Sequence, residues 1–132
     1  MDLFMLDTNI CIYAMKRNES VLKNLLSRTP AQIHISIVTE SELRFGAAKS
    51  AVPEKTLSAI ENFLAPISIV DFTRDDAIAY ADVRADLERR GTPIGPLDTF
   101  IAAQALARDF ILVTNNQAEF KRVKGLHVEN WA

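Results

Sequence analysis

Short apolar segments alternate with helix-like stretches along this chain, and this alternation limits the fold more than any other feature of the sequence. The apolar segments cover residues 3–6, 32–37, 67–70 and 110–113. The stretches between them carry apolar residues at helical spacing or are bounded by typical helix-starting and helix-ending residues. Strands that alternate with helices form a parallel sheet with helices on both faces. We therefore predict an α/β fold of three layers.

The other expected elements follow from the same patterns. A last apolar stretch, residues 126–131, is expected to add a short edge strand, and the polar loop 114–120 is expected to hold one helical turn. The composition is ordinary, 48% hydrophobic and 24% charged, so the 132 residues are expected to form one domain, 1–132. Helices are expected at about residues 10–16, 20–27, 38–49, 53–64, 73–90 and 96–108.

The sequence carries no sign of export or of membrane insertion. No apolar run approaches the roughly 18 residues that suggest a membrane span. The N-terminal segment has no basic region and reaches Asp2 at once, unlike a signal peptide. The single cysteine, Cys11, has no partner for an internal disulfide and is expected to be a small core residue. We therefore expect a protein of a reducing cytoplasm with no membrane partner.

The charge of the chain excludes one way of binding nucleic acid. A net charge of -2 argues against a protein that coats nucleic acid by bulk positive charge, but it does not exclude a nuclease with an acidic site. Basic residues do cluster, and each cluster is either a solvated surface or a place for phosphate contacts. The clusters are Lys16 with Arg17, Arg89 with Arg90, and Lys121 with Arg122 and Lys124.

The segment 89–105 changes from a turn into a helix and places one carboxylate at that junction. Two glycines and two prolines fall within residues 91–96, too close together for a helix or a central strand. Pro96 suits the first helical position, because its missing N–H group would be unpaired there. Asp98 then lies in the first helical turn. Its negative charge either interacts favourably with the positive end of the helix dipole or belongs to a functional site.

Several polar residues follow strands or begin helices. In a parallel sheet these positions meet at the carboxyl edge, where ligands bind in this fold class. Each also has a local alternative, because Asp7 can cap a helix and residues 39–42 fit a capping box. The residues are Asp7 after the first strand, Thr114 and Asn116 after the fourth apolar segment, and Glu42 and Asp98 near helix starts.

A group of carboxylates with no neighbouring base points to a bound cation, because the charges would otherwise repel one another. Oxygen ligands suit Mg²⁺ or Mn²⁺ rather than zinc. Such a site can activate water and stabilise the charge that develops on a phosphodiester during in-line attack. Metal-free cleavage would need a positioned acid and base. His34 and His127 are expected at outward-facing sheet positions instead.

Four motifs resemble those of the PIN-domain ribonucleases, specifically the VapC toxins of bacterial toxin–antitoxin pairs. They occur in the family's order and span nearly the whole chain. The resemblance implies a PIN fold, which is a parallel sheet of four or five strands flanked by helices. The motifs lie at residues 5–10, 36–46, 95–102 and 112–116, the last followed by Glu119 and Phe120.

The resemblance also implies an activity, that of an endoribonuclease dependent on Mg²⁺, for which Mn²⁺ substitutes. Many PIN domains have a further acid where this chain has Asn116. Glu119, one helical turn later, is the candidate replacement, and this leaves a second metal position open. Thr114 is implied to orient ligands through its hydroxyl group. The catalytic residues implied are Asp7, Glu42, Asp98 and Glu119, of which Asp7 and Asp98 hold the metal.

The resemblance implies partners as well. A VapB-type antitoxin would lay its C-terminal segment over the groove and block the site. The toxin would form a homodimer and a larger assembly that binds operator DNA through the antitoxin. The substrate would be tRNA, cut in the anticodon stem-loop, with initiator tRNA as a particular target and translation as the process inhibited. Phosphate contacts would come from Lys16, Arg17, Arg89, Arg90, Lys121 and Arg122.

Two other functions fit part of the sequence. A phospho-acceptor signalling domain would also place acids after strands, with Asp71 after a central strand. That class needs paired acids after the first strand and a lysine after the last, whereas here Asp7 precedes Thr8 and Thr114 stands near the lysine position. The second alternative is a PIN-fold module that binds without catalysis, which Asn116 supports.

Overall fold

A parallel sheet of five strands organises the computed structural model, which describes all residues 1–132. The strands lie in the order β3-β2-β1-β4-β5, with β1 in the centre. Every pairing is parallel, so the carboxyl ends of all five strands lie at one edge. The predicted parallel sheet is therefore confirmed. The strands are β1 (Phe4–Leu6), β2 (Ile33–Ser36), β3 (Ser68–Val70), β4 (Ile111–Val113) and β5 (Val128–Glu129).

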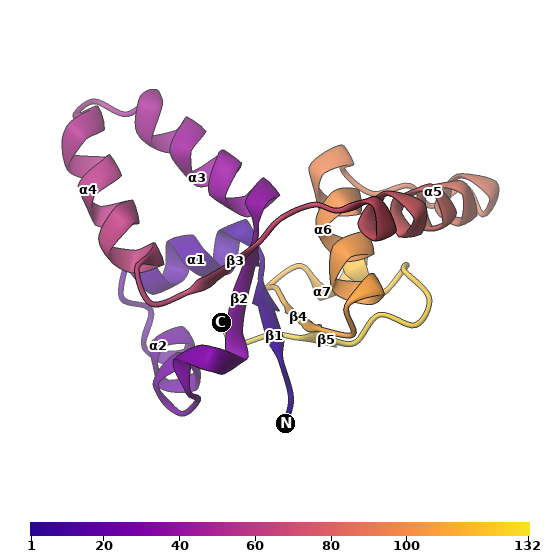
Figure 1. Ribbon diagram of the computed structural model, residues 1–132, viewed down its shortest axis with the longest axis horizontal. Coiled ribbons are helices and arrows are strands. Elements are labelled where there is room, and N and C mark those ends of the chain that lie inside the picture. The colour runs from indigo at the N-terminus through magenta and orange to yellow at the C-terminus, as the bar shows by residue number, and fades with distance from the viewer.

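Helices cover both faces of the sheet, with α1 to α4 on one side and α5 to α7 on the other (Figure 1). The expected helices are confirmed to within a few residues at their ends. None is long and apolar enough to cross a bilayer. The helices are α1 (Thr8–Met15), α2 (Glu19–Leu26), α3 (Ile37–Ala48), α4 (Pro53–Leu64), α5 (Arg74–Arg89), α6 (Pro96–Ala107) and α7 (Gln117–Phe120), with a short 3₁₀ helix, η1, at Pro30–Gln32.

The central strand explains why two helical layers are needed. All three residues of β1 are buried, and successive side chains of a strand point to opposite faces. Phe4 and Leu6 therefore belong to the core beneath α1 to α4, whereas Met5 belongs to the core beneath α5 and α6. A strand with no polar face is stable only when both faces are covered.

The start of α3 differs from the expected capping box at residues 39–42, and that prediction is wrong. β2 runs directly into α3, so Ser36 becomes the N-cap and its hydroxyl group accepts a hydrogen bond from the N–H of Val38 at 3.1 Å. Thr39 lies inside the helix and is fully buried. Glu42 therefore has no capping role, and its carboxylate is available to the carboxyl edge of the sheet.

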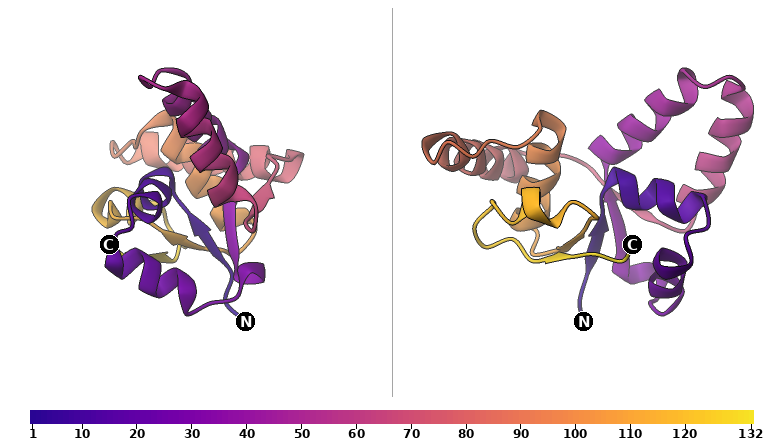
Figure 2. Two further views of the ribbon diagram at one scale, coloured as in Figure 1. Left: turned by 90° about the vertical axis from the view of Figure 1, so that its left-hand side faces the viewer. Right: turned by 180° about the vertical axis from the view of Figure 1, so that it is seen from behind.

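The C-terminal end of the chain returns to the side of α1 and α2 (Figure 2). Trp131 is buried and packs against Phe4, with 5.2 Å between the ring centroids. The guanidinium group of Arg28 lies 4.5 Å from the centroid of each of these two rings. This arrangement combines cation–π attraction with apolar burial and holds the C-terminal segment against β1 and α2.

β3 lies at the edge of the sheet, so the expectation that Asp71 follows a central strand is wrong. The backbone carbonyl group of Asp71 accepts hydrogen bonds from Gln104 and Arg108, each at 2.9 Å. Asp71 therefore helps to fasten the loop after β3 to α6. This structural role removes the main support for a phospho-acceptor domain.

The thiol group of Cys11 is expected to react with an aromatic disulfide reagent only after the protein unfolds. Cys11 is fully buried, as predicted, and burial raises the pKa of its thiol, with a further contribution from the charge of Asp7. Only the thiolate reacts, so both effects slow the reaction. The measurement is the absorbance released in native buffer and in guanidinium chloride. Rapid reaction in native buffer would contradict the buried position.

Candidate active site

Asp7 lies at the carboxyl end of the central strand, where it also caps α1. Its Oδ1 atom accepts a hydrogen bond from the N–H of Ile10 at 2.9 Å, and the residue is only 4% exposed. Burial raises the pKa of the Asp7 carboxyl group, although hydrogen bonds from the Thr114 hydroxyl group and from the Ile10 N–H oppose this effect. The two explanations for Asp7, cap and site carboxylate, are therefore compatible.

Thr114 lies beside Asp7, because β4 pairs with β1 in a register that sets Val113 opposite Leu6. It is fully buried directly after β4, and its Oγ1 atom accepts a hydrogen bond from the N–H of Asn116 at 3.0 Å. The same hydroxyl group acts to lower the pKa of Asp7, so it lies close to that carboxylate. The role of orienting ligands that the resemblance implies for Thr114 stays a prediction.

Glu42 reaches the same edge from α3. Its Oε1 atom accepts a hydrogen bond from the hydroxyl group of Thr8 at 2.7 Å. The hydroxyl group of Thr8 also lies 3.3 Å from that of Thr39. Glu42 is thus held against the start of α1, next to Asp7, and its charge contributes to the raised pKa of Asp7. Residues far apart in sequence are brought together here by the packing of α1 against α3.

Asp98 is the carboxylate most affected by its surroundings. Its pKa is raised to about 7, first by burial, then by Glu119, and also by the charges of Asp7 and Glu42. A helix N-terminus alone would lower the pKa of a carboxyl group, because it favours the negative charge. The helix dipole alone therefore does not explain the surroundings of Asp98. Asp7, Glu42, Asp98 and Glu119 together are called the carboxylate cluster below.

Glu119 faces Asp98 across Gly95. The N–H of Gly95 donates a hydrogen bond to Oε1 of Glu119 at 3.0 Å, and the side-chain amide of Asn116 donates to the other carboxylate oxygen. A Cβ atom at Gly95 would lie 3.4 Å from Oδ2 of Asp98 and 3.8 Å from Oε1 of Glu119. The glycine therefore gives both carboxylates room to approach the same point.

No cationic side chain neutralises this cluster. None of the ion pairs in the structure includes Asp7, Glu42, Asp98 or Glu119. No three His, Cys, Asp or Glu side chains are arranged to enclose a metal ion by themselves. Mg²⁺ keeps several waters and commonly binds through only one or two carboxylates, so this open, all-oxygen arrangement fits it. The assignment of Asp7 and Asp98 to such an ion, which the resemblance implies, stays a prediction.

The basic residues fall into two structural groups. The guanidinium group of Arg90 donates hydrogen bonds to the carboxylate of Asp86, at 2.7 Å, and to the backbone carbonyl group of Arg122. The guanidinium group of Arg122 in turn donates a hydrogen bond to the backbone carbonyl group of Pro93 at 2.9 Å. Arg90 and Arg122 therefore brace the loop that leads to Gly95. The others among the RNA-binding candidates, Lys16, Arg17, Arg89 and Lys121, are exposed.

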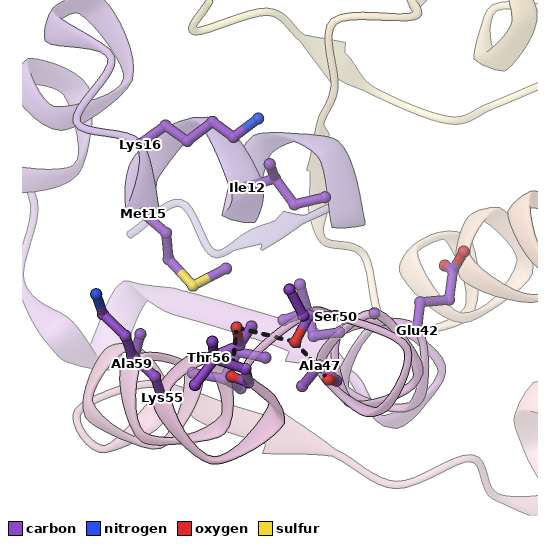
Figure 3. A pocket seen from close by; sticks show the side chains of 14 residues that line it. Ile12, Met15, Lys16, Glu42, Ala47, Ser50, Lys55, Thr56 and Ala59 are labelled. Carbon is purple, nitrogen blue, oxygen red and sulfur yellow. Dashed lines mark hydrogen bonds between the residues drawn. The ribbon is translucent and has the colours of Figure 1, made fainter.

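Lys16 lies at the rim of an apolar groove of about 590 Å³ between α1, α3 and α4 (Figure 3). Met15 and Lys55 also line this groove, and Glu42 lies at its end. Lys55 was not among the candidates expected from the sequence, because it stands alone in the chain. The groove thus connects a mostly apolar surface with one residue of the carboxylate cluster.

Two residues of the site were missed from the sequence. The sequence predicts no role in the site for Thr8, and Gly95 is predicted only as one of the two glycines of the turn at residues 91–96. Their roles depend on hydrogen bonds to Glu42 and Glu119, which come from other segments of the chain. The position of Thr8 directly after Asp7 was the one available signal. Nothing in the sequence pointed to the N–H of Gly95.

Neither histidine belongs to the site. The His34 ring is half-buried and stacks on Phe110, with 4.7 Å between centroids, so its expected outward-facing position is wrong. Helices cover both faces of the sheet, which leaves no outward face at that strand. His127 is exposed next to β5, as expected. Acid–base catalysis by a histidine pair therefore has no support here.

Known proteins resemble this chain over nearly its whole length. Residues 4–126 match the PIN domain family. The chain is 43% identical over 129 residues to the tRNA(fMet)-specific endonuclease VapC of Shigella flexneri, covering 98% of each chain. It is 39% identical to the protein of the same name from Salmonella typhimurium, covering 97% of each chain.

Solved structures give the same result. The DNA-bound VapBC structure from Salmonella typhimurium contains a chain with a TM-score of 0.95 and 40% identity, with full coverage of both chains. VapBC2 from Rickettsia felis, bound to a DNA fragment from its promoter, gives a TM-score of 0.92 at 39% identity, covering 98% of this chain and 99% of that one.

Proposed function

This chain belongs to the PIN-domain family and, within it, to the VapC ribonucleases, and on this premise we propose that it is the toxin of a toxin–antitoxin pair that cleaves RNA with a divalent metal ion. The observation that carries the proposal is the cluster of four carboxylates, from four segments of the chain, without any cationic partner. A cluster of this kind is stable in the ionised state only when a cation is bound.

In this proposal Asp7 and Asp98 hold Mg²⁺, and the other two acids act on water. When bound, the ion supplies positive charge that stabilises the phosphodiester in the transition state. Glu42, fixed by Thr8, and Glu119, fixed by Gly95, orient the attacking water and accept its proton. The bond from phosphorus to the 3′ oxygen breaks, and the leaving oxygen takes up a proton. The products carry a 5′-phosphate and a 3′-hydroxyl group.

We propose tRNA as the substrate class, with the anticodon stem-loop of initiator tRNA as the target. The support is the 43% identity to an endonuclease whose name specifies tRNA(fMet), extending over 98% of both chains. Cleavage of this tRNA in the bacterial cytoplasm would stop translation at initiation. The chain would work there as a toxin, which explains the need for an inhibitor.

The inhibitor in this proposal is a VapB-type antitoxin. The VapBC structures from Salmonella typhimurium and Rickettsia felis are similar over essentially the whole chain and were solved with DNA. We propose that the antitoxin's C-terminal segment occupies the apolar groove beside α4 and reaches Glu42, which lies at its end (Figure 3). Operator DNA would bind through the antitoxin, and the toxin would be a homodimer within the larger assembly.

Removal of divalent metal is expected to abolish RNA cleavage. The test is incubation of total bacterial RNA with purified, antitoxin-free protein in Mg²⁺ or in EDTA, followed by mapping of new 5′ ends. We expect a few discrete tRNA cuts with 5′-phosphates in Mg²⁺, none in EDTA, and recovery on addition of Mn²⁺. Cleavage that persists in EDTA would contradict the metal site. The absence of any cutting would instead favour a PIN-fold module that only binds.

A further inference from the structure

A second groove, of about 770 Å³, lies along α3 and opens at the carboxylate cluster. Thr8 and Glu42 line its inner end, and Leu97, the neighbour of Asp98, lines it from α6. Phe45 and Lys49 line its outer part. Any polynucleotide whose phosphate reaches Asp98 must lay its neighbouring nucleotides on the adjoining surface, and this groove is directly continuous with the cluster.

The groove displays an aromatic ring that the fold itself does not need. Phe45 is 64% exposed, and it contacts no other aromatic ring. The other two phenylalanines of the groove, Phe72 and Phe100, pack against other aromatic rings. Phe100 stacks on Tyr80 with 4.2 Å between centroids, and Phe72 meets Phe100 edge-on at 5.3 Å. A large exposed aromatic side chain beside a site commonly marks a binding surface.

A positive charge accompanies this ring. The ammonium group of Lys49 lies 4.9 Å from the centroid of Phe45, one helical turn along α3. Lys49 is exposed and is absent from the ion pairs of the structure. An exposed ring next to an unpaired cation is the combination that binds single-stranded RNA, because bases stack on the ring and phosphates attract the cation.

From this arrangement we propose that an unpaired nucleotide of the RNA substrate binds in the groove, its base stacked on Phe45 and its phosphate next to Lys49. The inference rests on the proposed ribonuclease function and adds two substrate-binding residues to it. Phe45 lies near the end of the second motif, residues 36–46, where no role was assigned to it, and Lys49 stands outside the basic clusters of the chain. The groove would favour substrates with an unpaired base beside the cleaved bond, as in a loop.

The test compares variants of Phe45 and Lys49 with matched variants outside the groove. Phe45→Leu keeps apolar bulk but removes the stacking face, whereas Phe45→Trp keeps it. Ile78→Leu, at an exposed apolar position on α5, is the control for the ring, and Lys23→Gln, on α2, is the control for the charge. The affinity probe is a short fluorescent single-stranded RNA of mixed sequence, measured by anisotropy in an Asp98→Asn background that prevents cleavage.

We expect Phe45→Leu to weaken RNA affinity by about tenfold, the loss typical of one stacked base, and Phe45→Trp to restore it. In the protein with native Asp98, Phe45→Leu should raise KM while changing kcat little. Lys49→Gln should reduce the dependence of log affinity on log salt by about 0.7, the value for one phosphate contact on a single strand. The two control variants should match the native protein in each measurement.

The possible failures can be told apart. If the native protein cuts RNA with Mg²⁺ but Phe45→Leu has unchanged affinity and KM, the groove proposal is wrong and the ribonuclease function stands. If Phe45→Leu changes only the oligomeric state, measured by sedimentation velocity, the groove is a protein interface and the proposal is also wrong. If the native protein cuts no RNA at all, the ribonuclease function itself fails.

Discussion

Asp98→Asn is expected to reduce the rate of RNA cleavage by about 10³-fold, the order of loss seen when one group that stabilises transition-state charge is removed. The substitution keeps the shape of the side chain but removes a metal-binding oxygen and its charge. Asp98 is also the carboxylate whose pKa responds to all three other acids of the cluster. The measurement is the initial rate of cleavage of tRNA at saturating Mg²⁺.

The same variant is expected to be more stable than the native protein in metal-free buffer. Because the folded protein raises the pKa of Asp98 to about 7, stability falls as the pH rises from the unfolded value of about 3.9, and the loss is complete above about 7. A neutral amide removes the repulsion from Glu119 and Asp7, so the midpoint of thermal unfolding should rise at pH 8. Loss of activity together with loss of stability would instead indicate misfolding.

A matched control distinguishes the effect of removing any one negative charge from the effect of removing the charge of Asp98. Asp82 is exposed on α5 and is not among the charges that raise the pKa of Asp7 or of Asp98, and Asp82→Asn also removes one negative charge. This variant should cleave RNA at the native rate and unfold at the native temperature. If it lost activity to the same extent as Asp98→Asn, the assignment of Asp98 to the metal site would be wrong.

Asp76→Ala is expected to destabilise the protein by about 3 kcal/mol, because it breaks a nearly buried ion pair and leaves its partners unsatisfied. Asp76 is only 1% exposed. Its Oδ2 atom accepts three hydrogen bonds, from the side chain of Arg108 at 3.0 Å, from the side chain of Gln104 at 3.2 Å and from the N–H of Thr73 at 2.9 Å. It therefore caps α5 and joins α5 to α6, the helix that carries Asp98.

The measurement is denaturant unfolding at pH 7, with Asp75→Ala as the control. Asp75 lies in the same first turn of α5, so its removal costs a similar interaction with the helix dipole, but it is exposed and has no hydrogen-bonding partner. A change within about 0.5 kcal/mol is expected for the control. Equal effects of the two substitutions would show that the network around Asp76 contributes no stability.

The contribution of Asp76 is expected to disappear in acid. Burial acts to raise the pKa of this carboxyl group, but the hydrogen bonds from Arg108, Thr73 and Gln104 outweigh it, so the pKa is lowered in the folded protein. A lowered folded pKa means that the stabilisation is present above the unfolded value of about 3.9 and is lost as the pH falls through the folded value. The difference in unfolding free energy between native protein and Asp76→Ala should therefore shrink below about pH 4.

Local signals determined most of the secondary structure. Proline at the start of α4 and of α6, and apolar segments of strand length, placed these elements because backbone restriction and side-chain periodicity act within a few residues. The position of Asp7 after β1 also followed directly, since parallel strands end at one edge. The capping box expected at residues 39–42 failed because a nearer hydroxyl group, that of Ser36, was already at the strand–helix junction.

The sequence by itself determined a parallel α/β fold and the residues that end up at its carboxyl edge, because both depend on patterns repeated along the chain. Only the tertiary structure decided how those residues meet. The hydrogen bond from Thr8 to Glu42 and that from Gly95 to Glu119 join segments that are 34 and 24 residues apart. The raised pKa of Asp98 is a sum of burial and of charges from three other segments. Such effects depend on distances through space, which no local pattern of residues specifies.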